Sequence, residues 1–333
     1  MSRTFIFYFL SNEQIGFGHF SRCLSIAEEV HCLEPDSAIY FYTDTPLELQ
    51  KKWIRLNIIN SHPVDNVLSE IKDKAPDVVV LDLKEIPKQL VDGIKGTGSK
   101  LVIIDNASKI VEKADIAVFP YLYEPPELKR IPRHVTVLHG PEYVLLNPNI
   151  IKKGGKPLFD VNSNRVVVTF GGSDPNDMLG HFIDYLARLP KFDFTVLMGK
   201  NYKFKSEIRD ICSECNHIEA HEFNWKIVDT LGPWKFVICG FGVSVFEFLY
   251  LGIPPVVINR YIDDDIKYAN ELEQKGLLVS LGYYKNLDFT TFKRRFEGIA
   301  NRNDFIKKIS SNGVELIDGK GAKRVSQIVV GGR

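Results

Sequence analysis

The sequence lacks three features that would assign it to a special class of protein. It has no excess of charge, because 42 lysines and arginines balance 42 aspartates and glutamates, whereas nucleic-acid-binding proteins usually carry a basic excess. It contains no run of about 18 apolar residues, which a membrane-spanning helix requires. It has only five cysteines in 333 residues, so a disulfide framework is not expected. We therefore expect a cytoplasmic protein that neither binds nucleic acid nor inserts into a membrane.

What the sequence does have is a regular alternation of short apolar runs with helical patterns. The apolar residues 4–10 have no small-residue cleavage site after them, so they predict a first strand rather than a signal peptide. Further strands are predicted at 37–43, 57–61, 77–82, 100–105 and 116–120, with helices at 20–33, 46–55, 66–73 and 87–95. Strand–helix–strand units of this length require parallel crossovers. The sequence thus predicts an α/β fold with a doubly wound parallel sheet.

The pattern pauses and then restarts in the second half of the chain. Residues 147–164, NPNIIKKGGKPLFDVNSN, have the composition of a linker. After them we predict strands at 165–170, 192–198, 217–223, 236–240 and 255–258, interspersed with helices that include 205–214, 226–231 and 245–251 and continue to the C-terminus. The predicted organisation is an N-terminal Rossmann-like domain (1–148), a linker (149–164), a C-terminal Rossmann-like domain (165–318) and a C-terminal helix (319–333). Because such sheets bind ligands beyond the carboxyl ends of their strands, we expect a cleft between the two domains.

The first candidate motif is Gly16-Phe17-Gly18-His19, at the turn from the first strand into the first helix. The two glycines let the backbone pass close to a ligand, and the helix start presents N–H groups with a partial positive charge. A histidine in this place suits a general base that acts near neutral pH. Alternatively, His19 caps or packs a tight turn.

The second candidate motif is Gly171-Gly172-Ser173-Asp174-Pro175, again between a strand and a helix. It fits a backbone nest for phosphate, to which Ser173 adds a hydroxyl. It also fits an ordinary turn with Asp174 as the helix N-cap and Pro175 as the first helical residue.

The third candidate motif, Gly240-Phe241-Gly242-Val243-Ser244, has the same position relative to strand and helix. Glu247 is expected within about the first turn of the helix, where its carboxylate could accept hydrogen bonds from a ribose diol. The alternative is a carboxylate that simply interacts with the helix dipole.

Two groups of potential metal ligands do not have the spacing of a metal site. Cys212, Cys215, His217 and His221 include residue types that bind zinc, but one residue alone separates Cys215 from His217, which is tighter than usual. In the run 263–265, three consecutive carboxylates cannot all face one ion. We expect neither a metal nor another cofactor.

Taken together, these motifs resemble a known family. Residues 15–27, IGFGHFSRCLSIA, resemble the opening signature of the UDP-sugar hydrolases of pseudaminic acid biosynthesis (UDP-2,4-diacetamido-2,4,6-trideoxy-β-L-altropyranose hydrolase) and their spore-coat polysaccharide relatives. Four later segments resemble segments of that family in the same order: GPEYVLLNP, VVVTFGGSDPND, GFGVSVFEFLYLGIPPVVI and IDGKGAKRVSQIV. The glycine turn followed by glutamate is shared more widely, for example with the peptidoglycan N-acetylglucosaminyltransferase.

The resemblance implies a GT-B fold, with two Rossmann-like domains whose parallel sheets face a central cleft. It implies that His19 deprotonates or orients a water that attacks the anomeric carbon, so that UDP leaves without a metal. The substrate- and nucleotide-binding residues that it implies are Gly16, Gly18, Arg22, Gly172, Ser173, Gly242, Val243, Ser244, Glu247, Asp264 and Asp265. Of these, the glycine-turn residues of the second domain would hold the diphosphate, and Glu247 the ribose.

The sequence departs from the family in two places. Asp264 and Asp265 stand where the family has an Asn-Gln pair that commonly faces the sugar, and the family's Asp-His-Tyr after the fourth strand is reduced to Asp82. A different sugar, or a different function, is therefore expected. The predicted function is a monomeric nucleotide-sugar hydrolase of nonulosonate or surface polysaccharide biosynthesis. The alternatives are a GT-B glycosyltransferase and a non-catalytic nucleotide-sugar-binding protein.

Overall fold

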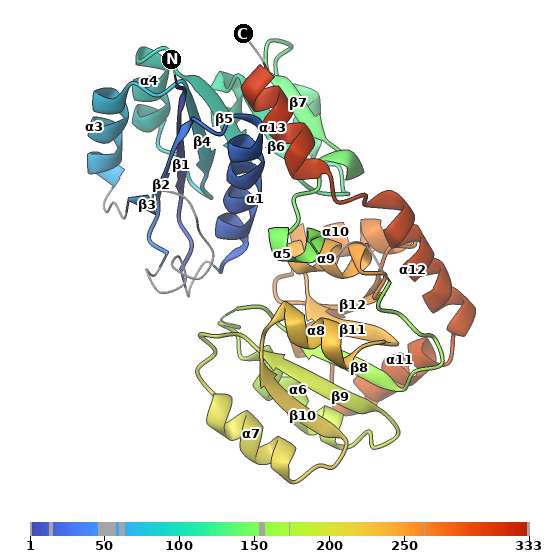
Figure 1. The fold of residues 1–333 in the computed structure, drawn as a ribbon. Helices are drawn as coiled ribbons and strands as arrows, with labels where there is room; N and C mark the ends of the chain where they lie inside the picture. Colours follow the sequence, from blue (N-terminus) through green and yellow to red (C-terminus); the bar gives the residue numbers. More distant parts are fainter. Residues whose placement is uncertain are drawn as a thin grey trace. The chain divides into compact units, whose positions relative to one another are not determined.

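The computed structural model describes residues 2–12, 16–45, 58–59, 64–152, 157–172, 174–262 and 264–331. Its contacts divide the chain into two compact units, Met1–Pro148 with Gly319–Arg333, and Asn149–Asp318. Each unit contains one parallel sheet with helices packed against it (Figure 1). The α/β fold class predicted from the sequence is confirmed in both halves. The predicted helix at 46–55 lies outside the described residues.

The sheet of the first unit has seven strands in the order β3-β2-β1-β4-β5-β6-β7. Its order runs outward in both directions from the pair β1 and β4, so the topological switch point lies between these two strands. The strands are β1 Thr4–Phe9, β2 Ala38–Tyr42, β3 Ile58–Ile59, β4 Val78–Asp82, β5 Lys100–Ile104, β6 Ile116–Phe119 and β7 Thr136–His139. The helices of this unit are α1 Gly18–Leu33, α3 Val64–Lys74, α4 Lys88–Gly96 and α13 Gly321–Gly331.

The sheet of the second unit has six strands in the order β10-β9-β8-β11-β12-β13, with its switch point between β8 and β11. The strands are β8 Arg165–Thr169, β9 Asp193–Met198, β10 Ile218–Glu222, β11 Phe236–Gly240, β12 Pro255–Asn259 and β13 Val279–Tyr283. The helices are α5 Pro148–Ile151, α6 Met178–Ala187, α7 Lys205–Ser213, α8 Trp225–Leu231, α9 Val243–Tyr250, α10 Asp264–Gln274, α11 Phe289–Ala300 and α12 Asn303–Leu316. Within the described residues, short 3₁₀ helices lie at Lys109–Lys113, Pro126–Arg130, Pro141–Tyr143 and Tyr284–Asn286.

Two strands were missing from the sequence prediction, and both lie at a sheet edge. We expected only helices after residue 258, which is wrong because β13 pairs with β12. Likewise β7 pairs with β6 at the far edge of the first sheet. Edge strands bury less of their surface than central ones, and β7 accordingly begins with two exposed residues, Thr136 and Val137. The sequences of β7 and β13 therefore lack the continuous apolar run by which the central strands were predicted.

The core of the first unit joins segments from both ends of the chain. Phe5, Phe7 and Phe9 alternate along β1 and are fully buried against α1 and α13. Burial of a phenylalanine side chain contributes about 1.5–3 kcal/mol relative to exposure. Helix α13 contributes Ala322, Val325 and Val329 to the same cluster. The core of the first unit therefore includes residues that follow the second unit in the sequence.

Helix α13 lies beside α1 (Figure 1), and the two pack closely. The hydroxyl of Ser326 donates to the carbonyl of Ile26 at 3.0 Å. At the start of α13, a Cβ on Gly321 would lie 2.1 Å from the carbonyl oxygen of Val144. A glycine is therefore required where α13 meets the segment that follows β7.

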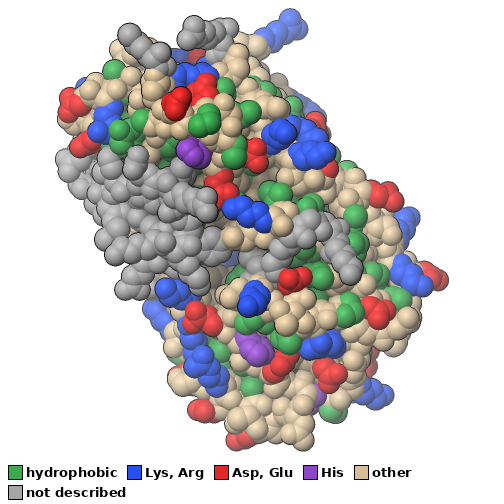
Figure 2. Space-filling view, viewed as in Figure 1, with side chains coloured by type: hydrophobic (Ala, Val, Ile, Leu, Met, Phe, Trp, Pro, Cys, Tyr) green, Lys and Arg blue, Asp and Glu red, His purple; other side chains and the backbone are tan. Residues whose placement is uncertain are grey.

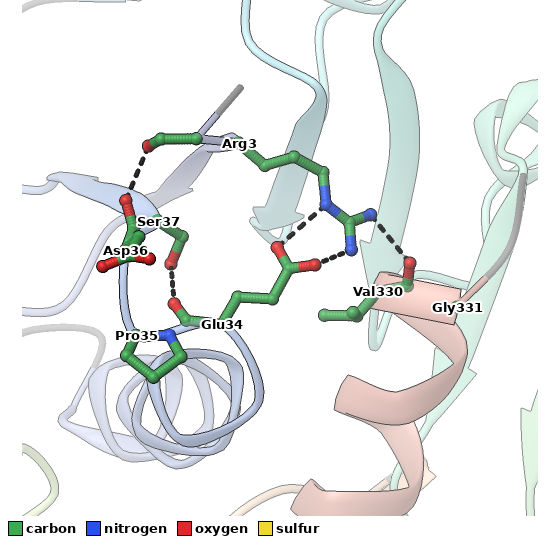
Figure 3. Close-up of a pocket in the computed structure, with 8 residues that line it drawn as sticks. Arg3, Glu34, Pro35, Asp36, Ser37, Val330 and Gly331 are labelled. Atoms are coloured by element: carbon green, nitrogen blue, oxygen red, sulfur yellow. Dashed lines mark hydrogen bonds and ion pairs between the residues drawn. The ribbon is translucent and has the colours of Figure 1, made fainter.

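Two basic side chains contact carbonyl groups at the other end of α13, and Figure 3 shows one of them, Arg3. Arg3 donates to the carbonyl of Val330 at 2.7 Å and also pairs with Glu34. Lys100 donates to the carbonyl of Val329 at 3.1 Å. Cations at a helix C-terminus interact favourably with its exposed carbonyls and dipole. The pocket beside Arg3, of about 530 Å³, lies at the amino ends of the strands, so it is at the edge opposite to the glycine turn after β1.

Candidate functional site

The turn after β1 holds the first predicted motif at the switch point of the first sheet. Gly16 has φ +92°, a left-handed conformation that favours glycine. Asp44, which follows β2, accepts hydrogen bonds from the backbone of Ser11 and the amide of Asn12, both at 2.5 Å. Helix α1 begins at Gly18, and no side chain of the described residues caps it. Asp44 thus holds the segment that precedes the turn. Gly16 and Gly18 lie at the start of a helix, where free N–H groups can bind an anion.

His19 is the second residue of α1, and its ring reaches the end of β4. Its Nδ1 lies 2.6 Å from Oδ1 of Asp82. The side chain of His19 is 12% exposed and that of Asp82 is fully buried. Burial raises the pKa of Asp82, but the charges and hydrogen bonds of Arg22 and His19 outweigh burial and leave this pKa below its ordinary value. Because Asp82 is ionised and can only accept, we infer that Nδ1 of His19 carries the proton of this contact.

Arg22 follows His19 by one helical turn and lies on the same face of α1. Its guanidinium donates to both oxygens of Asp82, at 3.0 and 2.8 Å, and also to Asp105. Burial lowers the pKa of Arg22, but Asp82 and Asp105 raise it by more, so the net shift is upward and the group stays charged. Arg22 is 4% exposed. The structure therefore places it in a buried ion-pair network that orients Asp82, and a direct contact with substrate remains a prediction.

Two members of this network were missed in the sequence analysis. Asp105 directly follows β5 with φ +54°, and it accepts hydrogen bonds from Arg22 and from the hydroxyl of Tyr121. Burial and the charge of Asp105 raise the pKa of Tyr121, so this hydroxyl keeps its proton. The signal was present, because Asp82 and Asp105 each come at the end of an almost continuous apolar run. Carboxylates in that position of neighbouring parallel strands converge on one edge of the sheet.

His19 also lines a pocket of about 230 Å³, together with Leu10, Leu83, Lys84 and Glu85. Within the described part of the chain, Nε2 of His19 has no hydrogen-bond partner. The arrangement can therefore accept a proton from a molecule that enters this pocket. Asp82 is placed to stabilise the positive charge that the ring then acquires.

In the second unit, the glycine turn after β8 differs from the sequence prediction. Gly171 has φ +92°, and a Cβ on Gly199, at the end of β9, would lie 1.9 Å from the carbonyl oxygen of Gly172. The expectation that Asp174 is the N-cap and Pro175 the first helical residue is wrong. Helix α6 begins at Met178, and Asp177 is its N-cap. Ser173 lies outside the described residues.

The reason for this difference is an additional turn before α6. Asp174 and Asp177 both have left-handed backbones, with φ of 41° and 49°, which moves the helix start three residues along the chain. The carboxylate of Asp174 still accepts from the N–H groups of Met178 and Leu179, at 3.1 and 2.8 Å. Burial raises the pKa of Asp174, although these hydrogen bonds oppose the shift. The start of α6 is thus already satisfied by two aspartates.

The glycine turn after β11 leads directly into α9. We predicted this helix at 245–251, but it begins at Val243, with Gly242 as an N-cap that offers no side chain. Val243 and Ser244 are thus first-turn residues, whose N–H groups have no partner within the helix. Glu247 is the fifth residue of α9 and 7% exposed. It lies in the second turn rather than the first, so the interaction with the helix dipole that we considered for it is weakened.

The remaining predicted residues open helix α10. Asp264 and Asp265 are its first two residues and follow β12 at the carboxyl edge of the second sheet. Asp263 lies outside the described residues. Among the side chains that the structure describes, no three of His, Cys, Asp and Glu form a group that could hold a metal ion.

Two surface properties accompany this geometry. On the face seen in Figure 2, acidic and basic side chains are interspersed, in keeping with the balanced formal charge. Over the described ranges, none of the helices has both the length and the apolar character needed to cross a bilayer.

Comparison with known proteins places the fold but not a family. No family model matches the chain. It is 26% identical over 279 residues to an uncharacterized protein, MJ1062, of Methanocaldococcus jannaschii, covering 79% of this chain and 55% of that protein. The chain thus spans about half the length of that relative. It is 21% identical over 322 residues to the spore coat polysaccharide biosynthesis protein SpsG of Bacillus subtilis, covering 94% of each.

Solved structures resemble this chain over almost its whole length. The UDP-GlcNAc 2-epimerase of Neisseria meningitidis, bound to UDP-GlcNAc, has a TM-score of 0.69 at 13% identity and covers 99% of this chain and 100% of its own. MurG of Acinetobacter baumannii has a TM-score of 0.67 at 11% identity, with 98% and 99% covered. The chain has the GT-B fold. The GT-B fold and the two Rossmann-like sheets predicted from the sequence are therefore confirmed, whereas identities this low say nothing of the reaction.

Proposed function

We propose that this chain is a nucleotide-sugar hydrolase, which releases UDP from a UDP-linked amino or deoxy sugar by attack of water at the anomeric carbon. The observation that carries the proposal is the pairing of His19 with the ionised Asp82, which leaves Nε2 free at a pocket on the switch point of the first sheet. Switch points are where open α/β sheets bind their ligands. A histidine held by a buried carboxylate is the usual arrangement of a general base.

In the proposed reaction, Nε2 of His19 takes a proton from water as the water oxygen bonds to the anomeric carbon. The bond from that carbon to the diphosphate breaks, and the diphosphate leaves with the electron pair. The transition state resembles an oxocarbenium ion. Asp82 stabilises the imidazolium that forms, and Arg22 fixes the orientation of Asp82 through two hydrogen bonds.

We assign nucleotide binding to the second unit. The backbone at Gly172, Gly242, Val243 and Ser244, with Ser173, would hold the diphosphate, and Glu247 would accept hydrogen bonds from the ribose. The support is the uncapped start of α9 beside the switch point between β8 and β11. Amide N–H groups at such a helix start bind phosphate without a metal. Asp264 and Asp265, at the start of α10, would then face the sugar.

The relatives support the choice of substrate class. SpsG is named for spore coat polysaccharide biosynthesis, and the Neisseria epimerase was solved with UDP-GlcNAc. The GT-B neighbours also include glycosyltransferases, among them that of calicheamicin. In a transferase the same histidine could deprotonate an acceptor hydroxyl instead of water, so the experiment must separate these outcomes.

The test is incubation of the purified protein with a panel of UDP-, CDP- and GDP-sugars, followed by measurement of free nucleotide and free sugar. The proposal requires equimolar release of both from at least one substrate without an added acceptor. Nucleotide release that depends on an acceptor would identify a transferase, and an altered sugar still bound to nucleotide would identify an epimerase. Binding without turnover across the panel would favour a non-catalytic protein.

A further inference from the structure

The glycine turn after β8 offers fewer free N–H donors to an anion than its sequence motif predicts. The N–H groups at the start of α6 are occupied, because Asp174 accepts from Met178 and Leu179 and Asp177 accepts from Gly180. Two carboxylates therefore stand where a phosphate would otherwise find donors. A carboxylate beside a diphosphate repels it. A nucleotide that binds at this switch point needs a cation close by.

Arg260 is placed to supply that cation. It directly follows β12 and is half-buried. A Cβ built on Gly240, the last residue of β11, would lie 3.8 Å from Nε of Arg260 and 3.9 Å from the ring of Phe170, which follows β8. Arg260 thus reaches across the carboxyl end of β11, toward the strand that carries the other glycine turn. Both candidate turns of the second unit begin at this point.

Among the described residues, no hydrogen bond or ion pair accounts for the position of the Arg260 guanidinium. Its Nε is buried, and within the described part of the chain this atom has no hydrogen-bond partner. Arg260 is also absent from the ion pairs of the described residues, and Asp174 attracts it only through longer-range charge. The neighbouring ring of Tyr261 lies 5.9 Å from the guanidinium carbon. A buried N–H group without a hydrogen-bond partner is costly unless something binds it.

Two more polar atoms at this edge of the sheet are unpaired. Oγ1 of Thr169, which ends β8, and Oδ1 of Asn259, which ends β12, are buried without a hydrogen-bond partner among the described residues. Thr169 is 2% exposed and Asn259 is fully buried. Strands β8 and β12 are the two neighbours of β11 in the sheet. Buried polar atoms without a partner among the described residues thus lie at the carboxyl ends of both strands that flank β11.

We propose that Arg260 is the cationic contact of the nucleotide diphosphate in the second unit. This inference rests on the proposed function, since it assumes that the switch point between β8 and β11 binds a nucleoside diphosphate. A guanidinium can donate two parallel hydrogen bonds to phosphate oxygens. Its charge offsets the repulsion from Asp174, and the unpaired donor on Nε becomes satisfied when the ligand binds.

The experiment is calorimetric titration, with excess EDTA, of the full chain and its variants with UDP, CDP and GDP and with the matching nucleosides. Arg260→Met keeps much of the side-chain volume and removes the charge. We expect about ten- to hundredfold weaker binding of the diphosphate and no change in binding of the nucleoside. Arg260→Lys keeps the charge without the planar fork and should retain an intermediate affinity. Arg209→Met is the matched control, because Arg209 is exposed on α7 of the same unit, and it should bind as the parent does.

The outcomes separate this inference from the function on which it rests. If the parent binds no nucleoside diphosphate at all, the proposed nucleotide site itself is wrong. If the parent binds and Arg260→Met binds equally well, Arg260 is not the cationic contact and the proposed function stands. An equal loss for diphosphate and nucleoside would also overturn the phosphate assignment. Melting temperatures of the unliganded variants show whether each variant is folded. If Arg260→Met does not fold, the affinity of Arg260→Lys for the diphosphate tests the proposal instead.

Discussion

Nδ1 of His19 lies 2.6 Å from Oδ1 of Asp82, a contact that joins the first turn of α1 to the last residue of β4. The two residues are 63 positions apart in the chain. They meet because β1 and β4 are neighbours at the switch point, so the helix after β1 begins beside the end of β4. Arg22 holds the same carboxylate through hydrogen bonds to both of its oxygens. The orientation of the imidazole is thus set by the sheet order as well as by the turn.

The first prediction concerns His19→Asn. Asparagine keeps a polar group at the turn but cannot take a proton from water, so we expect turnover to fall by about a hundred- to ten-thousandfold. Affinity for the nucleotide, which we assign to the other unit, should not change. Steady-state rates on the true substrate and calorimetry with UDP measure the two effects separately.

His31→Asn is the matched control for this experiment, because His31 is exposed in the last turn of the same helix. Near-parental turnover in His19→Asn would show that His19 only shapes the turn. Equal losses of turnover and UDP affinity would instead assign it to phosphate binding.

Asp82→Asn tests Asp82 as the residue that positions His19. The amide can present its NH₂ group to Nδ1, which favours the wrong tautomer, and it cannot stabilise the imidazolium. We expect a fall in turnover of about a hundredfold or more with little change in KM. If turnover falls as much in Asp105→Asn, which does not contact His19, the effect comes from disruption of the Arg22 network rather than from the tautomer.

The sequence was sufficient to predict the alternation of central strands and helices, and its resemblance to a known family predicted the GT-B fold. Central strands such as β4 and β11 are nearly continuous apolar runs, and a glycine turn separates β11 from its helix. It was insufficient at the sheet edges, where β7 and β13 are only partly buried. Hydrophobic periodicity reports burial, so it fails for strands that the fold leaves partly exposed.

The candidate site was only partly visible in the sequence for a different reason. The glycine turns are local and could be recognised as motifs. Asp105 and Arg260 belong to no motif, and their importance comes from strands that are distant in the chain but adjacent in the sheet. Strand order depends on the packing of the whole unit, so a local pattern cannot supply it. The start of α6 shifted for a similar reason, since two left-handed aspartates added a turn.

A further prediction concerns Glu247, which is buried in the second turn of α9. Glu247→Gln keeps the shape and removes the charge, so the fold should be retained. If the carboxylate accepts hydrogen bonds from a ribose, its loss costs about 1.5–3 kcal/mol, or about ten- to a hundredfold in UDP affinity. Calorimetry with UDP measures the change. Unaltered affinity would leave Glu247 with a structural role in the helix.

Binding of UDP should not require a divalent metal. The donors that we assign to the diphosphate are backbone N–H groups and the guanidinium of Arg260, none of which needs a bridging ion. Titration with UDP in excess EDTA, compared with titration in excess Mg²⁺, should give the same affinity. Loss of binding in EDTA would contradict the assignment and direct attention to the aspartates at the start of α10.

The last prediction uses two buried carboxyls whose pKa values are shifted in opposite directions. The pKa of Asp82 is lowered by its partners, so its contribution to stability is present above the unfolded value of about 3.9 and is lost as the pH falls through the folded value. The pKa of Asp174 is raised by burial. Its contribution is therefore present below about pH 3.9 and is lost as the pH rises through the folded value. Substitution by asparagine removes the titration in each case.

Asp82→Asn should consequently lose about 3–5 kcal/mol near neutral pH, because Arg22 loses a buried partner, and the loss should shrink as the pH falls below about 4. Asp174→Asn should show the reverse trend, with its largest loss in acid and a smaller loss as the pH rises. Urea unfolding of both variants and the parent at a series of pH values gives the two curves, each read from the transition of the unit that carries the residue. Parallel curves would show that the two carboxyls share one environment. Opposite slopes would establish that the partners of Asp82 lower its pKa while burial raises the pKa of Asp174 at the start of α6.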